Sequence, residues 1–171
     1  MKSLSVEEMN RLLDVARQHS ERNYLVLLIG YSHGLRVSEI AGLRVRDVCT
    51  GFLDVKRLKG SNRTVQALTD REKAAIEPFC AGKQPSDKLF PVSRVTLWRM
   101  FKQNCQLAQI PDIPGRGIHA LKHSIAMHSI HAAGIEAVRV YLGHKSLAST
   151  GAYLKLSDQQ ASQAVQSTLS R

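Results

Sequence analysis

Hydrophobic residues recur at the spacing of amphipathic helices along most of the chain, and at the spacing of strands in one region only. The helical period occupies residues 5–19, 21–31, 37–43, 69–80, 93–109, 119–134 and 135–143. Two of these segments begin with a capping box, in which Ser5 precedes Glu8 and Thr69 precedes Glu72 by three positions. The pattern therefore predicts a mostly helical chain with one strand-forming insert.

The insert has the pattern of a β-hairpin. The runs "FLDVKRL" (Phe52–Leu58) and "RTVQAL" (Arg63–Leu68) alternate apolar and polar residues and flank the turn sequence "KGSN". The expected fold class is α+β, mostly α with a small antiparallel β-sheet, in a single domain over residues 1–171. The tail at 157–171 has a thin apolar face and could form a separately docking helix.

The composition favours a cytoplasmic protein. Cys49, Cys80 and Cys105 are an odd number of cysteines without a CxxC pair, which argues for reduced thiols and against a zinc ribbon. The longest apolar run, "YLVLLIGY", is far shorter than a membrane span, so no membrane partner is expected. Acidic residues near the N-terminus argue against a signal peptide.

The net charge of +10 is unevenly distributed. Residues 1–50 carry seven Lys or Arg against six Asp or Glu, whereas residues 51–171 carry seventeen against eight. A basic excess over part of a folded domain favours a polyanion partner, most simply nucleic acid, although a solvated basic face would give the same count. Aromatic residues make up only 5% of the chain, which argues against a single-strand binder that stacks bases.

Two candidate sites for chemistry lie in the first half of the chain. In "HGLRVSEI", Arg36 follows a helix-stopping glycine and could direct its guanidinium at a phosphate, or simply pair with Glu39. Lys59 lies at the expected hairpin tip. There it could contact a phosphate, act as a general acid, or be an ordinary turn lysine.

Three more candidates lie in the second half. In "HALKH", helical spacing puts His119, Lys122 and His123 on one face, where an anion would be a suitable ligand. His119 and His123 also have the spacing of a zinc pair, but an HExxH acid and a nearby third ligand are missing. In "LGHKSLASTGAYLK", His144 follows a glycine, and Tyr153 is either a surface tyrosine or a nucleophile.

The order of these motifs resembles the catalytic domain of the tyrosine recombinases, the phage integrase family. "GLRVSEI" resembles the family's first box, "HALKHS" its second and "LGHKSLASTGAYL" its third, so that the resemblance extends from about Leu4 to Leu156. It implies a site-specific recombinase or integrase from a prokaryote or phage, which cleaves and rejoins DNA. The implied partners are double-stranded DNA and further protomers, in a tetramer.

The resemblance also implies a role for each candidate residue. Arg36, Lys122 and His144 would bind the scissile phosphate. Lys59 would protonate the leaving 5′-oxygen, and His119 would assist proton transfer. Tyr153 would attack the phosphate. The attack would give a 3′-phosphotyrosyl intermediate. Fixed cations can stabilise the charge on the phosphate oxygens, so that no metal and no cofactor is expected.

Two features depart from the family. The second box usually has His-x-x-Arg, and Lys122 keeps the charge of that arginine but loses its two-pronged fork. Losing one hydrogen bond to a transition-state oxygen could cost about 2–4 kcal/mol, so the alternative is a catalytically impaired DNA-binding or regulatory relative. A working or slow enzyme is favoured, because the other five positions match. The family's N-terminal DNA-binding domain is missing from this sequence, which favours a fragment over a naturally short protein.

Overall fold

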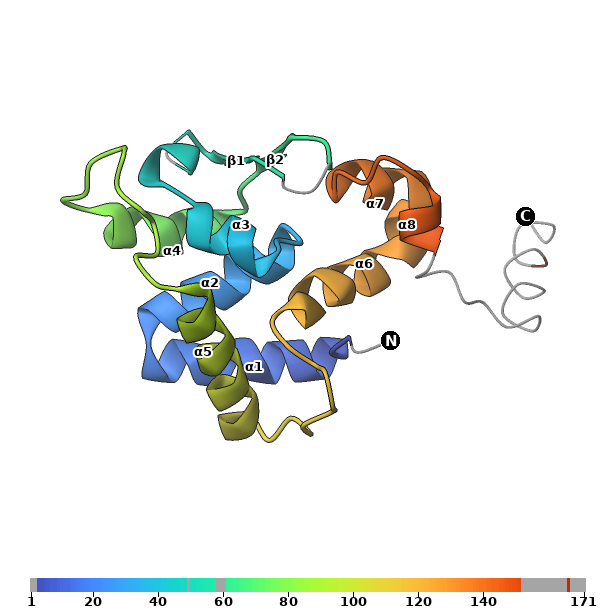
Figure 1. Cartoon of the computed structure of the whole chain (residues 1–171), viewed down its shortest axis with the longest axis horizontal. Coiled ribbons are helices and arrows are strands. Elements are labelled where there is room, and N and C mark those ends of the chain that lie inside the picture. Colours follow the sequence, from blue (N-terminus) through green and yellow to red (C-terminus); the bar gives the residue numbers. More distant parts are fainter. Residues whose placement is uncertain (1–2, 49, 58–60, 152–165, 167–171) are drawn as a thin grey trace.

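The computed structural model describes residues 3–48, 50–57, 61–151 and 166. In chain order the elements are α1 (Val6–His19), α2 (Glu21–Ser32), α3 (Val37–Gly42), the 3-10 helix η1 (Val45–Asp47), β1 (Phe52–Val55), β2 (Thr64–Ala67), α4 (Asp70–Cys80), α5 (Arg94–Leu107), α6 (His119–Ala133), α7 (Ile135–Tyr141) and α8 (Ala148–Gly151). Figure 1 shows the sheet along one edge of the molecule, next to α7. The expected mostly helical fold with a small antiparallel sheet is confirmed.

The helix α2 forms the centre of the fold because it is apolar on all sides. Every residue from Tyr24 to Gly30 is buried, and α1, α3, α4 and α6 all pack against this helix. A helix without a polar face is stable only when other elements surround it. No helix in the described part of the chain is long and apolar enough to cross a membrane.

Both predicted capping boxes are present. Ser5 Oγ accepts from the backbone N–H of Glu8 at 3.1 Å, while Glu8 Oε2 accepts from the N–H of Ser5 at 2.9 Å. Thr69 and Glu72 form the same pair at the start of α4. These side chains satisfy backbone donors that a helix end leaves without partners, which explains why local sequence fixed both helix starts.

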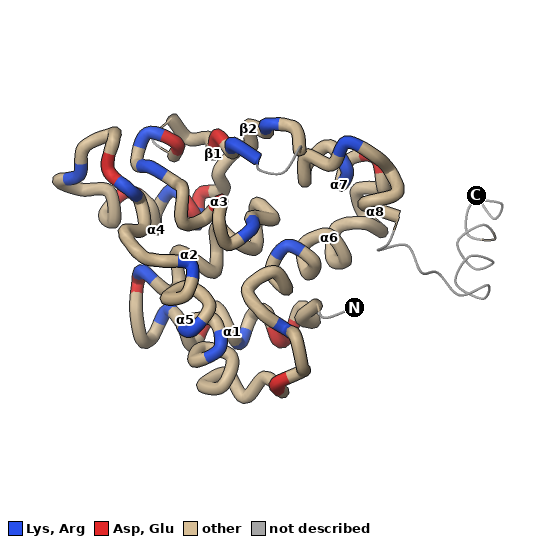
Figure 2. Tube along the Cα trace, in the orientation of Figure 1, with Lys and Arg blue, Asp and Glu red and all other residues tan. Residues whose placement is uncertain are grey.

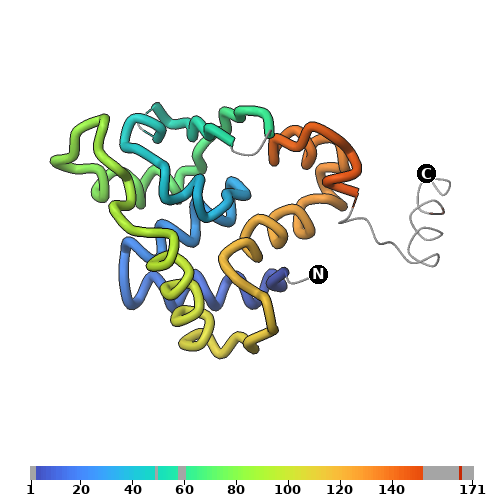
Figure 3. The backbone as a smooth tube through the Cα atoms, viewed as in Figure 1, coloured from blue at the N-terminus to red at the C-terminus, as the bar shows by residue number. Residues whose placement is uncertain are grey.

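The start of α1 lies beside α6, although more than a hundred residues separate them in sequence. The N–H of Leu4 donates to Ser124 Oγ at 2.8 Å, and His128 Nε2 lies 3.0 Å from the carbonyl oxygen of Leu4. Figure 3 shows these blue and orange segments of the backbone next to each other. The N-terminal segment is thus packed against a helix from the second half of the chain.

The strands are shorter than predicted. Phe52 pairs with Ala67 and Val55 with Thr64, and the ladder ends there. The predicted extension to Leu58 is wrong, because Arg57 leaves the sheet and turns its side chain into the protein, where its guanidinium has acceptors. Lys59, expected at the hairpin tip, lies outside the described residues, as does the tail at 157–171 except for Gln166.

The loop before β2 is fastened to the turn after α7. The N–H of Asn62 donates to the carbonyl oxygen of Gly143 at 2.9 Å. Gly143 has a φ of 68°, and a Cβ at this position would lie 2.5 Å from the carbonyl oxygen of Asn62. Only glycine allows both this conformation and this close approach.

We expect Gly143→Ala to destabilise the protein more than Gly82→Ala. Gly82 also has a positive φ, of 77°, but a Cβ there would meet no atom within 4 Å. The free energy of unfolding should fall by about 1–2 kcal/mol in both variants, because alanine is strained in the left-handed region. It should fall by at least about 1 kcal/mol more in Gly143→Ala, because the added Cβ collides with Asn62. Urea unfolding of both variants measures the difference. Equal losses would mean that the loop and the turn separate at little cost.

Candidate active site

Arg36 lies at the turn between α2 and α3, where Gly34, with a φ of 57°, reverses the chain. Its Nη1 donates to Glu39 Oε1 at 2.9 Å, and its backbone N–H donates to Glu39 Oε2 at 2.7 Å. The side chain of Glu39 is only 1% exposed, whereas that of Arg36 is 25% exposed. The ion pair that the sequence suggested as an alternative is therefore present. It orients the guanidinium and leaves part of it at the surface.

Lys122 is buried in α6. Its Nζ donates to the carbonyl oxygen of Leu142 at 3.3 Å. Burial lowers the pKa of Lys122 to about 7, and the positive charges of Arg57 and Arg36 act in the same direction, against the opposing carboxylate of Glu39. Near neutral pH this amine therefore exchanges between its charged and neutral forms.

His144 follows α7 and is buried. Its Nδ1 lies 2.9 Å from Thr150 Oγ1 in α8, and its backbone N–H donates to the carbonyl oxygen of Arg139. Burial, followed by the charges of Lys122 and Arg36, lowers the pKa of His144 to about 4. The imidazole is consequently neutral at physiological pH, with its orientation set by Thr150.

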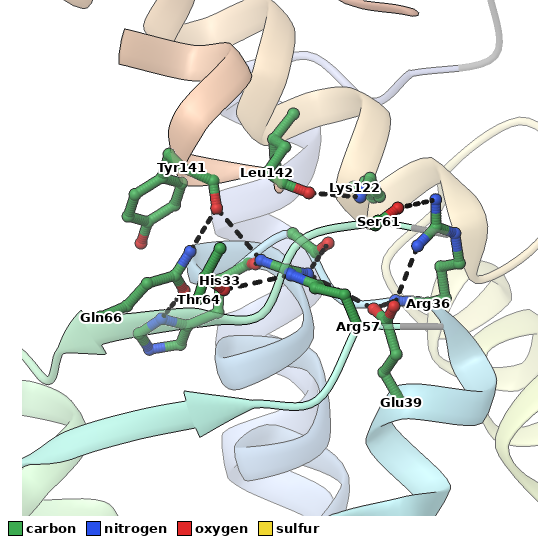
Figure 4. Close-up of polar contacts among 11 residues, drawn as sticks. His33, Arg36, Glu39, Arg57, Ser61, Thr64, Gln66, Lys122, Tyr141 and Leu142 are labelled. Carbon is green, nitrogen blue, oxygen red and sulfur yellow. Dashed lines mark hydrogen bonds and ion pairs between the residues drawn. The ribbon is translucent and has the colours of Figure 1, made fainter. Parts of the chain in front are cut away.

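The residue type that sequence analysis missed is a buried arginine. Figure 4 shows Arg57 beneath Arg36 and Lys122, with the three cations brought together from the loop after β1, the start of α3 and α6. The strand pattern contained one indication of this burial. Leu53, Val55 and Arg57 alternate along the strand sequence and so point to the same face, and all three are buried. A charged residue in a buried phase needs partners, and only the structure identifies them.

His119 lies at the start of α6 and lines a cavity of about 750 Å³ between α5 and α6. The cavity is also lined by Val37, Arg94, Trp98, Lys102, Arg116 and His123. Val37 follows Arg36 directly in the chain, but Arg36 and Lys122 are not among the lining residues. Trp98 is 49% exposed and lies on α5 together with Arg94 and Lys102, and Figure 2 shows the basic positions of this helix in blue.

His119, Lys122 and His123 lie within about 100° of one another around α6, as their spacing implies, but their side chains have different surroundings. At about 100° per residue, positions 122 and 123 lie about 60° to one side and about 40° to the other side of position 119. His123 lines the cavity with His119, whereas Lys122 points toward the turn after α7. Within the described ranges no three His, Cys, Asp or Glu side chains are grouped as metal ligands.

Tyr153 lies outside the described residues, but the other three tyrosines are described. Each of their hydroxyl groups has a hydrogen-bond partner: Tyr24 with Arg71, Tyr31 with His128, and Tyr141 with Ser32. Burial raises the pKa of Tyr141 to about 12 and that of Tyr31 above its usual value. A hydroxyl group that resists deprotonation is a poor nucleophile, so these two tyrosines are poor replacements for Tyr153.

Residues 2–160 match the model of the phage integrase family. The chain belongs to this family. Tyrosine recombinase XerA of Pyrococcus furiosus is 31% identical over 178 residues, which cover 96% of the chain and 61% of that protein. Tyrosine recombinase XerD of Pseudomonas aeruginosa is 33% identical over 172 residues, which cover 89% of the chain and 56% of that protein. This phage integrase family chain thus spans about six tenths of the length of these relatives.

Solved structures share the fold. The crystal structure of XerA recombinase has a TM-score of 0.79 at 23% identity and covers 97% of this chain and 63% of that one. The catalytic domain of bacteriophage HP1 integrase has a TM-score of 0.74 at 21% identity and covers 96% of this chain and 93% of that one. The expected fold, that of a tyrosine recombinase catalytic domain, is confirmed.

The buried amine of Lys122 predicts a stability that rises with pH. Its pKa is about 7 in the folded chain, against 10.5 for an ordinary lysine. Between these values the unfolded chain binds more protons, so the free energy of unfolding should increase as pH rises through this window. Urea unfolding should show this increase in the wild type and in Lys145→Met, a change on the exposed side of the neighbouring turn. Lys122→Met should lack this increase. If the free energy of unfolding rises equally with pH in the wild type and in Lys122→Met, the lowered pKa does not belong to Lys122.

Proposed function

We propose that this chain is the catalytic domain of a site-specific tyrosine recombinase, which cleaves and rejoins double-stranded DNA without a metal. The observation that carries the proposal is the meeting of Arg36, Lys122 and His144 in a chain that matches the phage integrase family over residues 2–160. Displacement at a phosphodiester concentrates negative charge on the phosphate oxygens. Donors already fixed in place stabilise this charge without having to reorganise.

Each of the three residues suits a different part of that task. Arg36, fixed by Glu39, would offer its guanidinium fork to two phosphate oxygens. Lys122 would offer one ammonium group, which a phosphate would stabilise in its charged form. In His144 the Nδ1 atom faces Thr150, so that Nε2 would be the atom that meets the phosphate.

The roles of Lys59, His119 and Tyr153 rest on the resemblance and on their neighbours. Ser61 Oγ accepts from Arg36 at 3.3 Å, so Ser61 lies at the candidate active site. Lys59 is only two positions before Ser61, which supports Lys59 as the proton donor to the leaving 5′-oxygen. Thr150, which contacts His144, is three positions before Tyr153. This short separation in sequence supports Tyr153 as the nucleophile. His119, one turn before Lys122, would assist proton transfer.

The cavity beside His119 supports a polyanion partner. Two basic lining residues, Arg94 and Lys102, could contact the phosphate backbone of duplex DNA, whereas Arg116 is buried and donates to the carbonyl oxygens of Ser3 and Pro111. Two relatives have solved complexes with DNA, namely XerH with its difH substrate and a lambda integrase dimer with a core site. We extend this to further protomers, in a tetramer on paired sites, and to the cytoplasm of a prokaryote or of a phage's host.

A catalytically impaired DNA-binding relative is the second candidate, and Lys122 favours it. An amine with a pKa of about 7 that already donates to Leu142 is a weaker phosphate ligand than an arginine. Both candidates predict salt-dependent binding to duplex DNA, whereas only the recombinase forms a covalent bond to it.

We expect Tyr153→Phe to abolish the covalent protein–DNA adduct on a nicked suicide substrate in the presence of EDTA. The fold and the DNA affinity should be nearly unchanged, because only a hydroxyl group is lost. Tyr141→Phe is the matched control and should still form adduct, since the hydroxyl group of Tyr141 is hydrogen-bonded to Ser32. Denaturing gel electrophoresis measures both. An adduct with Tyr153→Phe would mean that the nucleophile is another residue.

We expect the advantage of Lys122→Arg over the wild type to grow with pH. Arginine stays charged where the buried lysine loses its proton. With a pKa of about 7 the charged fraction of Lys122 falls about fiftyfold between pH 7 and pH 9, so the ratio of cleavage rates should rise by up to that factor. Single-turnover cleavage at saturating DNA measures the ratio, and Lys122→Ala serves as the reference. If Lys122→Ala cleaves as fast as the wild type, Lys122 does not contact the reacting phosphate.

A further inference from the structure

Arg57 is a buried cation that satisfies every donor of its guanidinium. Its side chain is 0% exposed. Arginine has five N–H donors. The five acceptors are the carbonyl oxygens of Gly34 (2.9 Å), His33 (2.9 Å) and Tyr141 (3.2 Å), Glu39 Oε2 (3.3 Å) and Thr64 Oγ1 (3.2 Å).

These acceptors come from three separate parts of the chain. His33, Gly34 and Glu39 belong to the turn between α2 and α3 and to α3 itself, Thr64 begins β2, and Tyr141 ends α7. Burial lowers the pKa of Arg57, and Glu39 opposes this effect. A buried charge is stable only with such complete pairing, so the five contacts fix the three segments relative to one another.

Two of these three segments lead directly to residues of the candidate active site. Glu39 gives one oxygen to Arg57 and the other to Arg36. The carbonyl group of Tyr141 is followed by that of Leu142, which accepts from Lys122, and then by the turn that ends in His144. Figure 4 shows Arg57 at the centre of these contacts. Glu39 lies between Arg57 and Arg36, and the neighbouring carbonyl groups of Tyr141 and Leu142 accept from Arg57 and from Lys122.

We propose that Arg57 is a positioning residue for strand cleavage, which sets where Arg36, Lys122 and His144 meet the phosphate by fixing Glu39 and the Tyr141 carbonyl group. The inference rests on the proposed function and adds to it a residue that does not itself touch DNA. Gln66 supports the same arrangement, because its Nε2 also donates to the carbonyl oxygen of Tyr141, at 2.5 Å.

The charge of Arg57 has a second consequence for Lys122. The charged groups that face Lys122 are Arg36 and Glu39 beside α3 and Arg57 from the loop after β1. On either side, His123 on α6 and His144 after α7 are further titratable groups that interact with it. Removing the charge of Arg57 while Glu39 remains should favour the protonated amine of Lys122. The alkaline limb of the cleavage pH profile should then move to higher pH, which a merely structural loss would not cause.

The test is single-turnover cleavage of a suicide duplex by the whole chain, with DNA affinity measured separately. Arg57→Lys keeps the charge but has three donors for five acceptors, so it should cleave at least about tenfold more slowly, with DNA affinity within about twofold and an unmoved pH profile. Arg57→Met should also be slow, and its alkaline limb should move upward. Arg63→Lys, an exposed arginine on the same hairpin, is the matched control and should match the wild type.

Circular dichroism at the assay temperature first establishes that each variant is folded. Folded Arg57 variants that cleave at the wild-type rate overturn the proposal, as does a loss that lies wholly in DNA affinity. If Arg57→Met does not fold, Arg57→Lys decides through its rate and affinity alone. A wild-type chain that forms no adduct would instead overturn the proposed function, and the role of Arg57 with it.

Discussion

The buried carboxylate of Glu39 is the interaction on which the rest of the site depends. It accepts from Arg36 through one oxygen and from Arg57 through the other, and in the described part of the chain it is the negative charge that acts on Lys122. Three cations this close would repel one another and resist burial without it. One shared anion allows a cluster that remains positive enough for a phosphate and can still be packed into a folded domain.

The parts of the fold that the sequence predicted are those that short stretches of chain determine. The helix starts at Ser5 and Thr69 follow from a side chain and a backbone group three positions apart. The turn at Gly34 follows from a positive φ that glycine adopts without strain. The position of Arg36 next to Glu39 was also predictable, since one turn of helix brings the two together.

The remaining features depend on contacts between distant segments, which local patterns do not contain. The strand that was expected to reach Leu58 ends at Val55, because Arg57 finds its acceptors in α3 and at the end of α7. The partner of Lys122 was not predictable either, because the carbonyl group of Leu142 lies 20 positions away in the sequence. The roles of Lys59 and Tyr153 stay predictions, since both residues lie outside the described part of the chain.

The fastening of Asn62 to Gly143 has a consequence for the order in which the molecule folds. This contact closes a loop of some eighty residues, and so does the bond from Arg57 to Tyr141. The entropy of closing a loop must be lost before its contacts form, so we expect these contacts to form after the local helices. The cation cluster therefore requires that these distant segments have already met. A chain released from the ribosome half-folded would carry its helices but no site able to grip a phosphate.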